Sequence, residues 1–141
     1  MEKLKRRFES RRIGYYLCDN MNLQTTLTEL INEFGADKRF NKLGYTDCEI
    51  LRDINLLDLI KGIKTIDIQH PSKNISDIDN YSHFLDEIRK NTMVDIFITQ
   101  ADGITEKGEI LFKDEIGNRI AGTIFGPQRV IVLADNNNIY D

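Results

Sequence analysis

Residues 95–133 read DIFITQADGITEKGEILFKDEIGNRIAGTIFGPQRVIVL, and this stretch decides the fold. Its apolar runs, 94–99 and 129–133, have the length and the branched side chains of buried strands. Strands that alternate with helices along a chain form a mostly parallel sheet, whose ligands bind at the carboxyl ends of the strands. We therefore expect a site among the polar residues between the two runs, which are Thr105, Glu106, Asp114, Gly117, Asn118 and Arg119.

Two turns shape this polar segment. Residues 104–105 and 109–112 flank Glu106-Lys107-Gly108, which predicts a β-hairpin near 104–112, inserted into the alternation. Gly117-Asn118-Arg119 predicts a turn into a short helix, and Gly126-Pro127 predicts its end. Both turns would place polar side chains outside the strands.

The rest of the chain continues the alternation of strands and helices. Strands are predicted at 13–18, 40–45 and 63–68, and helices at 23–35, 46–62 and 76–88. The last two helices each begin with a capping box, Thr46-x-x-Glu49 and Ser76-x-x-Asp79. Residues expected on the buried face of the third helix are Tyr81, Phe84, Leu85 and Ile88. We predict one α/β domain over residues 1–141, a three-layer fold with helices on both faces of a mostly parallel sheet.

The composition is that of a globular protein. Of the 141 residues, 40% are hydrophobic and 30% are charged, a balance that excludes a disordered chain. No apolar run approaches the roughly 20 residues that span a bilayer, and no apolar segment of a secretory signal follows the start. We expect a cytoplasmic protein with no membrane contact.

The first twelve residues are basic. They carry six basic side chains against two acidic ones, a charge of +4, which leaves −8 for the remainder of a chain with net charge −4. A basic arm can bind nucleic acid, but no aromatic stacking platform or groove-reading motif accompanies this one. We expect instead a solvated helix with Leu4 and Phe8 facing the core, and no nucleic acid.

The cysteines and histidines predict no metal site and no cofactor. Cys18, Cys48, His70 and His83 do not have the spacing of a zinc or iron–sulfur site. Cys18 closes the apolar run 13–18 and is expected in the core. Cys48 is predicted in the first turn of a helix, where the dipole would lower the pKa of its thiol.

The turn at Gly117 and the tip of the hairpin offer different chemistry. A helix that begins at Asn118 would present free N–H groups beside the Arg119 guanidinium, a site for a carboxylate or a phosphate. Asn118 is also suited to a plain N-cap, and Asp114 is suited to an ion pair with Arg119. Glu106 is the candidate catalytic residue, as an acid, a base or a nucleophile, against the alternative of a solvated turn residue.

The same polar segment resembles the lactate-utilisation (LUD) domain family. The family pattern runs as Ala-Ile-Thr-Glu-x-Gly-x-(Leu/Ile), an Asp, Gly-Asn-Arg-(Val/Ile)-Ala, Phe-Gly-Pro and a Val/Ile strand. Matching residues here are Ile104, Thr105, Glu106, Gly108, Asp114, Gly117, Asn118, Arg119, Ala121, Phe125, Gly126 and Pro127. Asp95-x-Phe97 also resembles the family's preceding strand.

A weaker resemblance lies upstream, in residues 43–59. The family has Gly-Gly-Ser-x-Thr-Leu there, followed by a Gly-Leu-Leu-Asp helix. This chain keeps Gly44, has Tyr45-Thr46-Asp47 in place of the small-residue turn, and has Asn55 in place of the helix glycine. If that turn receives a ligand in the family, Gly44 and Thr46 are the contacts here, and Tyr45 narrows the site.

The resemblance implies a fold related to ribose-5-phosphate isomerase, glucosamine-6-phosphate deaminase and CoA transferases. It also implies a place in the oxidation of lactate to pyruvate, beside iron–sulfur proteins, although this chain has no cysteine-rich segment and should bind no cluster. Family sequences continue past the last strand, whereas this chain stops at 136–141. The strand 130–133 would then have an exposed flank, from which we expect a homodimer.

Two functions remain open at this point. The first is the binding, or the conversion as an enzyme, of a small carboxylate or phosphorylated metabolite such as a hydroxy acid, a keto acid or a phosphosugar. The second is a non-catalytic scaffold that binds a protein partner of a redox system. A response to small ligands discriminates between them.

Overall fold

The computed structural model describes residues 1–63, 66–69 and 81–141. Its elements, in chain order, are α1 (Glu2–Ser10), α2 (Asn20–Gly35), β1 (Lys42–Tyr45), α3 (Glu49–Asp53), α4 (Leu56–Lys61), β2 (Asp67–Gln69), α5 (Tyr81–Thr92), β3 (Ile96–Gln100), β4 (Gly103–Thr105), β5 (Ile110–Leu111), α6 (Asn118–Ile124), β6 (Arg129–Leu133), the 3₁₀ turn η2 (Asn136–Asn138) and β7 (Ile139–Tyr140).

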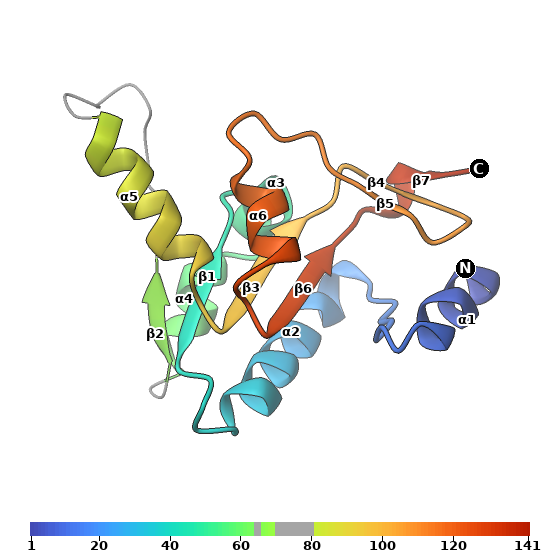
Figure 1. Cartoon of the computed structure of the whole chain (residues 1–141). Helices are drawn as coiled ribbons and strands as arrows, with labels where there is room; N and C mark the ends of the chain where they lie inside the picture. Colours follow the sequence, from blue (N-terminus) through green and yellow to red (C-terminus); the bar gives the residue numbers. More distant parts are fainter. Residues whose placement is uncertain (64–65, 70–80) are drawn as a thin grey trace.

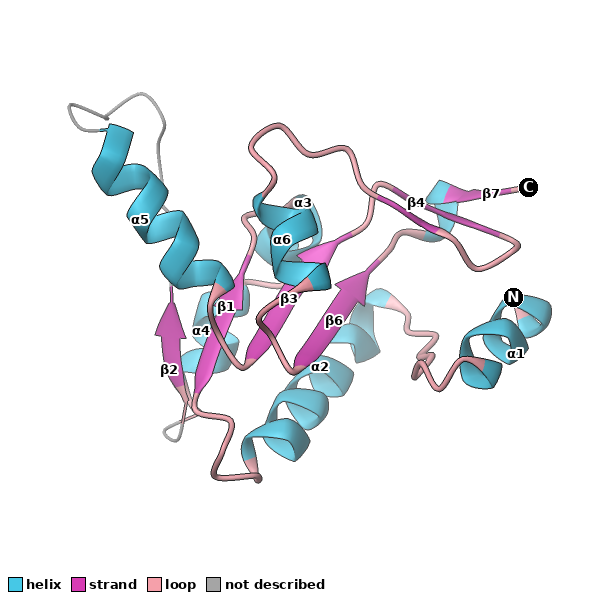
Figure 2. Cartoon of the chain, viewed as in Figure 1, coloured by secondary structure: helices cyan, strands magenta, loops and turns pink. Residues whose placement is uncertain are grey.

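Two sheets organise these elements. The larger sheet has the strand order β2-β1-β3-β6 with all pairs parallel (Figure 1). The smaller sheet has the order β5-β4-β7, in which β4 and β5 form the predicted antiparallel hairpin and β7 pairs with β4 in parallel (Figure 2). The predicted α/β class is confirmed, whereas β7 was not predicted.

Helices cover both faces of the larger sheet. Residues of α2, α3 and α4 form one buried cluster with alternate residues of the strands, among them Leu43, Ile96 and Ile98. On the opposite face, α6 packs Gly122 against the ring of Phe97, and α5 packs against β1. Since successive strand residues point to opposite faces, this alternation accounts for strands that are apolar throughout.

Strand β1 is held by side chains at both ends. At its amino end, the Asp95 carboxylate accepts hydrogen bonds from the backbone N–H groups of Asn41 and Lys42, both at 2.9 Å. At its carboxyl end, the buried Asn91 side chain accepts from Tyr45 N at 3.2 Å and donates to Tyr45 O at 2.8 Å. Gly44 is the last residue of β1 that pairs with β2 in the described residues. Asn91 bonds to the backbone of the next residue, Tyr45.

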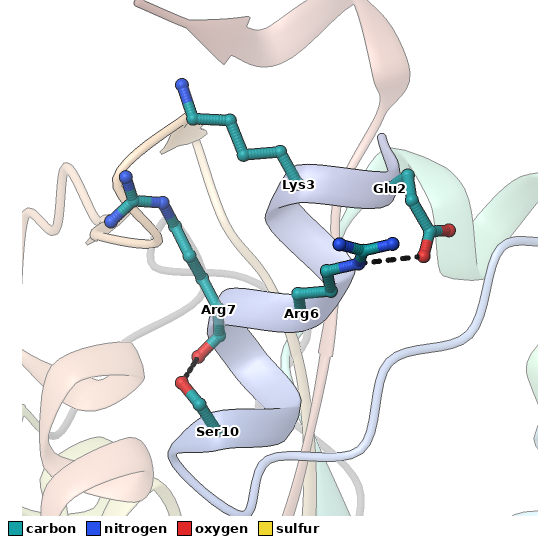
Figure 3. Close-up of a pocket in the computed structure, with 5 residues that line it drawn as sticks. All are labelled: Glu2, Lys3, Arg6, Arg7 and Ser10. Atoms are coloured by element: carbon teal, nitrogen blue, oxygen red, sulfur yellow. Dashed lines mark hydrogen bonds and ion pairs between the residues drawn. The ribbon is translucent and has the colours of Figure 1, made fainter.

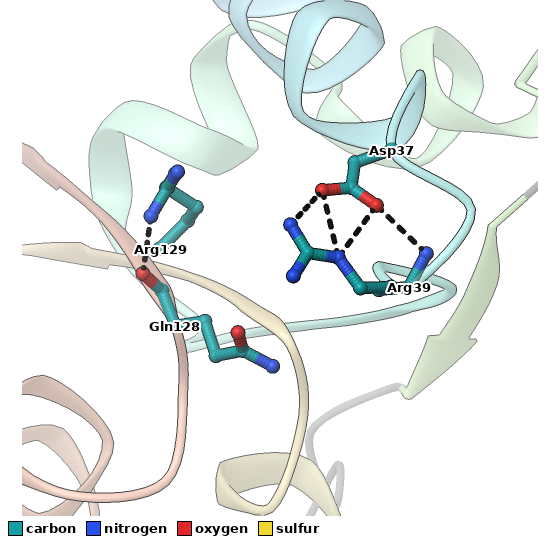
Figure 4. Close-up of polar contacts among 4 residues, drawn as sticks. All are labelled: Asp37, Arg39, Gln128 and Arg129. Atoms are coloured by element: carbon teal, nitrogen blue, oxygen red, sulfur yellow. Dashed lines mark hydrogen bonds and ion pairs between the residues drawn. The ribbon is translucent and has the colours of Figure 1, made fainter.

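Charged and aromatic side chains close the amino end of the sheet, and Figure 4 shows the charged ones, Asp37, Arg39 and Arg129. Asp37, in the turn after α2, accepts from Arg39 Nη2 at 2.6 Å, and these hydrogen bonds lower the pKa of Asp37 to about 2. The Arg129 guanidinium lies over the rings of Phe34 and Phe40, at 5.7 and 5.3 Å from their centroids. The start of β6 is thereby fixed to the end of α2.

The predicted strand at 13–18 is wrong. These residues form an irregular link between α1 and α2, and Ile13, Tyr16 and Leu17 are 44%, 59% and 61% exposed. Cys18 lies half-buried in this link, not in a strand of the core. β-propensity reflects packing against neighbouring strands, and no strand pairs with this segment in the described parts of the chain.

The predicted helix at 46–62 is interrupted. It begins at Glu49, after Cys48, and it breaks at Asn55, which adopts a left-handed conformation with φ of 48° before α4 begins. The capping box is also wrong, because the Thr46 hydroxyl bonds to Thr99 and not to the helix start. Gly62 does follow the last helical residue, as expected.

The remaining helices follow the sequence more closely. α2 ends at Gly35 with Leu27, Leu30 and Ile31 buried, and α1 buries Leu4 and Phe8 as predicted. In α5, Phe84 is buried, but Tyr81 is 64% exposed and does not face the core. His70 and the capping box Ser76-x-x-Asp79 lie outside the described residues. In the described parts of the chain, no helix has both the length and the apolar character that crossing a membrane requires.

Replacing Gly44 tests the contact between α5 and β1. A Cβ at Gly44 would stand 2.1 Å from the Asn91 backbone oxygen, so we expect Gly44→Ala to lower the free energy of unfolding by about 2 kcal/mol or more. Gly62→Ala is the matched control, because the φ of Gly62 is −73° and a Cβ there would stand 3.8 Å from the Leu59 backbone oxygen. Urea unfolding should show the control unchanged or about 0.5–1 kcal/mol more stable. Equal losses in both variants would contradict the predicted contact.

The Asp37–Arg39 pair predicts a pH dependence. NMR titration should place the Asp37 pKa near 2 rather than at its ordinary 3.8, and Arg39→Gln should move it upward. Because the folded pKa is lowered, the pair stabilises the protein above pH 3.8, and that contribution is lost as the pH falls toward 2. A midpoint at 3.8 in the unaltered protein would refute the ion pair.

Candidate functional site

The chain reverses its direction across the sheet between β1 and β3. After β1 the chain passes through α3 and α4 to β2 at one edge, and after β3 it passes through α6 to β6 at the other edge (Figure 1). The two connections lie on opposite faces of the sheet. Ligands of open α/β sheets bind at such a switch point, outside the carboxyl ends of the strands. The candidate site is therefore the end of β1 and β3.

Two threonines join the strands at this point. The hydroxyls of Thr46, just after β1, and Thr99, in β3, lie 3.0 Å apart, and Thr46 N donates to Ile98 O at 3.0 Å. Both threonines are buried, at 3% and 0% exposure. Thr46, a predicted ligand contact, thus bonds within the protein and joins the carboxyl ends of β1 and β3. Gly44, the other predicted contact on β1, is buried against Asn91.

The turn after Thr46 carries the half-buried Cys48. Burial raises the pKa of this thiol and outweighs a backbone hydrogen bond with Leu51 that lowers it, so the net shift is opposite to the predicted one. A smaller, opposing effect on that pKa comes from the positive charge of Arg119, which belongs to α6. Arg119 therefore lies within electrostatic range of the β1–α3 turn. Next to Cys48, Ile50 N donates to the Gln100 side chain at 3.4 Å, a contact that joins the turn to the end of β3.

Arg119 is held in place by the segment that follows β3. Its Nη1 lies 3.2 Å from Asp102 Oδ2, and its Nη2 donates to the Lys113 carbonyl. The same Asp102 carboxylate accepts from Lys113 N at 2.6 Å. The Arg119 side chain is 23% exposed, so its guanidinium is oriented and still reaches solvent. The suggested partner Asp114 is not the one that Arg119 binds in the structure.

The start of α6 is occupied by a carboxylate of the chain itself. Gly117 precedes the helix with φ of 82°, and Asp114 Oδ2 accepts from Ile120 N at 2.9 Å. Asn118 is the first helical residue and is not the N-cap that the sequence suggested. Because Asp114 already uses one of the N–H groups that a bound anion would need, the side chain of Arg119 is the better candidate for an anion contact.

Glu106 lies at the other end of the hairpin. Its backbone N–H donates to Tyr140 O at 2.7 Å, and its carboxylate lies 3.4 Å from Lys3 Nζ in α1. Thr105 bonds to Glu109 within the same turn, at 2.9 Å. Arg119 binds at the base of the hairpin and Glu106 stands at its tip, so the structure does not bring these predicted site residues together.

Helix α1 also borders a surface hollow (Figure 3). It is lined by Glu2, Lys3, Arg6, Arg7 and Ser10, all from one helix. Arg6 Nε pairs with Glu2 at 3.3 Å, and α1 is fixed to the hairpin by Arg11, which donates to Gly108 O at 3.0 Å. The hollow holds no residue of the strand ends, and we do not count it as part of the candidate site.

Asp102, Thr99 and Gln100 are site residues that sequence reasoning missed. They follow directly on the apolar run of β3, in the sequence Thr99-Gln100-Ala101-Asp102. The available signal was their place at the carboxyl end of a buried strand. The described residues contain no group of three or more His, Cys, Asp or Glu side chains that could hold a metal.

Comparison with known proteins identifies the family. The model of the LUD domain matches residues 1–141, the whole chain. The chain belongs to the LUD domain family. It is therefore a domain related to lactate utilisation, as its polar segment suggested. No curated protein and no solved structure matches this LUD domain.

The threonine pair can be tested by a double-mutant cycle. Thr46→Val or Thr99→Val alone leaves a buried hydroxyl without its partner and should cost about 1–3 kcal/mol of unfolding free energy. The double replacement should cost much less than the sum, because both hydroxyls are removed together. Urea unfolding of the cycle gives the coupling energy. Additive losses would show that the two hydroxyls do not interact.

Proposed function

We propose that this LUD domain binds a small carboxylate or phosphorylated metabolite at the carboxyl ends of β1 and β3. Hydroxy acids and keto acids are the first class to consider, because the family is related to lactate utilisation. Arg119 is the proposed anion contact. The observation that supports this most strongly is that a partly exposed guanidinium is oriented by Asp102, which follows the carboxyl end of β3 by two residues.

The geometry of Arg119 suits a carboxylate. A guanidinium carries five N–H groups, and the contacts to Asp102 and Lys113 use two of them. The others can donate to an incoming carboxylate or phosphate as a charge-assisted pair. Asp102 then becomes the carboxylate beside the bound ligand, a position that suits an acid–base group better than that of Glu106 at the hairpin tip.

The second candidate function is a non-catalytic domain that binds a protein partner of a redox system. The burial of Cys48 and the contact of Glu106 with Lys3 favour it, because neither is arranged as a nucleophile with its base. In this alternative, Arg119 and Asp102 only fix the hairpin to α6. The two functions differ in their response to small ligands.

A thermal-shift panel tests the proposed function. Lactate, pyruvate, other hydroxy acids, phosphosugars and CoA esters would be added, and a ligand at about 1,000 times its Kd should stabilise by about 4 kcal/mol. Arg119→Ala should weaken the binding of the responding ligand by roughly 10- to 100-fold, the loss of one charge-assisted contact. Arg119→Lys should recover part of it, since the charge remains and the planar fork is lost.

Matched controls separate binding from stability. Arg89→Ala removes an exposed arginine of α5, paired with Asp86 at 2.8 Å, and should leave the ligand response unchanged. Glu106→Gln should also leave it unchanged if the site lies at the strand ends. No response of the unaltered protein across the panel would favour the partner-binding function. A response that survives Arg119→Ala would refute the assignment of this site.

A further inference from the structure

Helix α1 and the turn that follows it carry more positive than negative charge. Three of the six basic side chains of residues 1–12 form exposed ion pairs, at N···O distances of 3.3–4.0 Å. Only one of those pairs, between Lys3 and Glu106, brings in a carboxylate from outside residues 1–12. Within the described residues no ion pair involves the other three, Arg7, Arg11 and Arg12. The fold therefore leaves most of the charge of +4 on this segment without a counter-charge.

This basic segment lies at one end of the molecule. Figure 1 shows α1 apart from the larger sheet, at the side of the hairpin. Arg11 fixes it there by donating to Gly108 O at 3.0 Å, and Leu4 and Phe8 are buried. The remaining residues of the chain carry a net charge of −8. The protein is thus positive at one end and negative over the rest, a distribution that orients a protein with its positive end toward an anionic surface.

The link after α1 folds back along the helix. Ile13 N donates to Phe8 O at 3.0 Å, and the ring of Tyr15 stacks on the ring of Phe8 with centroids 6.1 Å apart. The Tyr15 hydroxyl then reaches the Met1 sulfur, at 3.9 Å. Since Met1 and Phe8 stand about two helical turns apart, Tyr15 and its neighbours in the link lie beside α1. The residues that follow the basic segment in the sequence therefore also adjoin it in space.

Large apolar side chains of this link point into solvent. Ile13, Tyr16 and Leu17 are exposed, and Met21, in the first turn of α2, is 88% exposed. Residues 10–18 contain no acidic side chain. Exposed apolar side chains that gather beside a positively charged helix mark an interaction surface. We call α1 and the link through Met21 the basic end.

We propose that the basic end binds the surface of an anionic lipid bilayer, with its Lys and Arg side chains against the phosphate headgroups and Leu17 and Met21 in the interfacial region below them. Attraction to anionic lipid supplies the counter-charge that the fold lacks. Burial in the interface removes from water the apolar side chains that the fold leaves exposed. The apolar side of α1 is already buried against the hairpin, so α1 itself stays at the level of the headgroups.

A bilayer fits this surface better than nucleic acid or an acidic protein does. Nucleic acid would pair with the same charges, but the aliphatic side chains of Ile13, Leu17 and Met21 have no ring on which a base could stack. An acidic protein would need a shape that matches an irregular link, whereas the interface of a bilayer accepts apolar side chains without a fixed shape. The sequence predicted no membrane contact together with a buried strand at 13–18, and the fold exposes apolar side chains of that segment instead.

Vesicle sedimentation tests the proposal on the full chain. The protein should sediment with vesicles of phosphatidylglycerol and phosphatidylcholine in equal parts, but not with vesicles of phosphatidylcholine alone, and added salt should release it. The triple variant Lys5→Gln, Arg6→Gln and Arg12→Gln removes three exposed charges and keeps the contacts of Lys3 and Arg11 with the hairpin. Each basic side chain near the surface contributes a factor of about 5 to binding, so the affinity should fall roughly 100-fold.

The control removes the same number of charges elsewhere. Lys38→Gln, Lys61→Gln and Lys90→Gln change exposed lysines outside the basic end, after α2, in α4 and in α5. Because both triple variants lower the net charge equally, a difference between them reports the position of the charge and not its total. The control should bind the anionic vesicles as the unaltered protein does, and both variants should keep the circular dichroism spectrum of the fold.

Insertion of the link has a readout of its own, since the chain contains no tryptophan. Leu17→Trp places a fluorescent side chain in the link, and its emission should shift to shorter wavelength when anionic vesicles are added. Ile124→Trp, at a residue of α6 that is 78% exposed, is the matched control and should show no shift.

Three results would overturn the proposal, namely no sedimentation at low salt, equal binding by the two triple variants, or no emission shift for vesicle-bound Leu17→Trp. Tighter binding to a single-stranded oligonucleotide than to the anionic vesicles would overturn it as well, and would assign the basic end to nucleic acid. Because the readout is binding to lipid, failure here leaves the ligand test of Arg119 unaffected.

Discussion

The bond between the Asn91 side chain and the backbone of Tyr45 is the constraint on which the position of the site depends. Among the described residues, the pairing of β2 with β1 ends at Gly44, one residue before Tyr45. The Asn91 amide supplies both a donor and an acceptor there. Gly44 allows this contact because it has no Cβ in the way of the Asn91 backbone. The direction in which the chain leaves β1, toward Thr46 and α3, follows from it.

The two ends of the sheet differ in their chemistry. At the amino end, Asp95 bonds to the start of β1 and its carbonyl accepts from the residues that begin β6, so one residue ties three strands together. Arg129 and the rings of Phe34 and Phe40 close the space beneath. At the carboxyl end, charged side chains with partial exposure remain, Asp102 and Arg119 among them. An end that is packed serves stability, and an end that keeps oriented charges can serve binding.

The sequence predicts those parts of the fold that depend on local patterns. β6 was predicted with its observed bounds, and α2 with its stop at Gly35, because apolar spacing and glycine are properties of the segment itself. The pairing of a strand with its neighbours is not a property of the segment itself. Residues 13–18 have the composition of a strand, yet they lie in a link, because composition does not reveal whether a neighbouring strand is available.

The site was predicted only in part, because local patterns do not reveal contacts between segments that are distant in the sequence. The run Gly117-Asn118-Arg119 correctly marked a turn into a helix, but the partners of its residues lie at distances that a local pattern does not encode. Arg119 binds Asp102, across the whole hairpin, and Thr46 binds Thr99, more than fifty residues away. A threonine three residues before a glutamate satisfies the capping pattern equally well, so only the fold decides between the two bonds.

Asn55 shows how a departure from the family pattern can be understood physically. The family pattern has glycine at this position, and here the residue adopts φ of 48°, a conformation that glycine reaches without strain. Asparagine tolerates it better than other residues, and the Asn55 side chain donates to Asp58 in the first turn of α4. The break between α3 and α4 is therefore kept although the glycine is absent. This local conformation lets α3 and α4 bend so that residues of both helices pack in one cluster on the same face of the sheet.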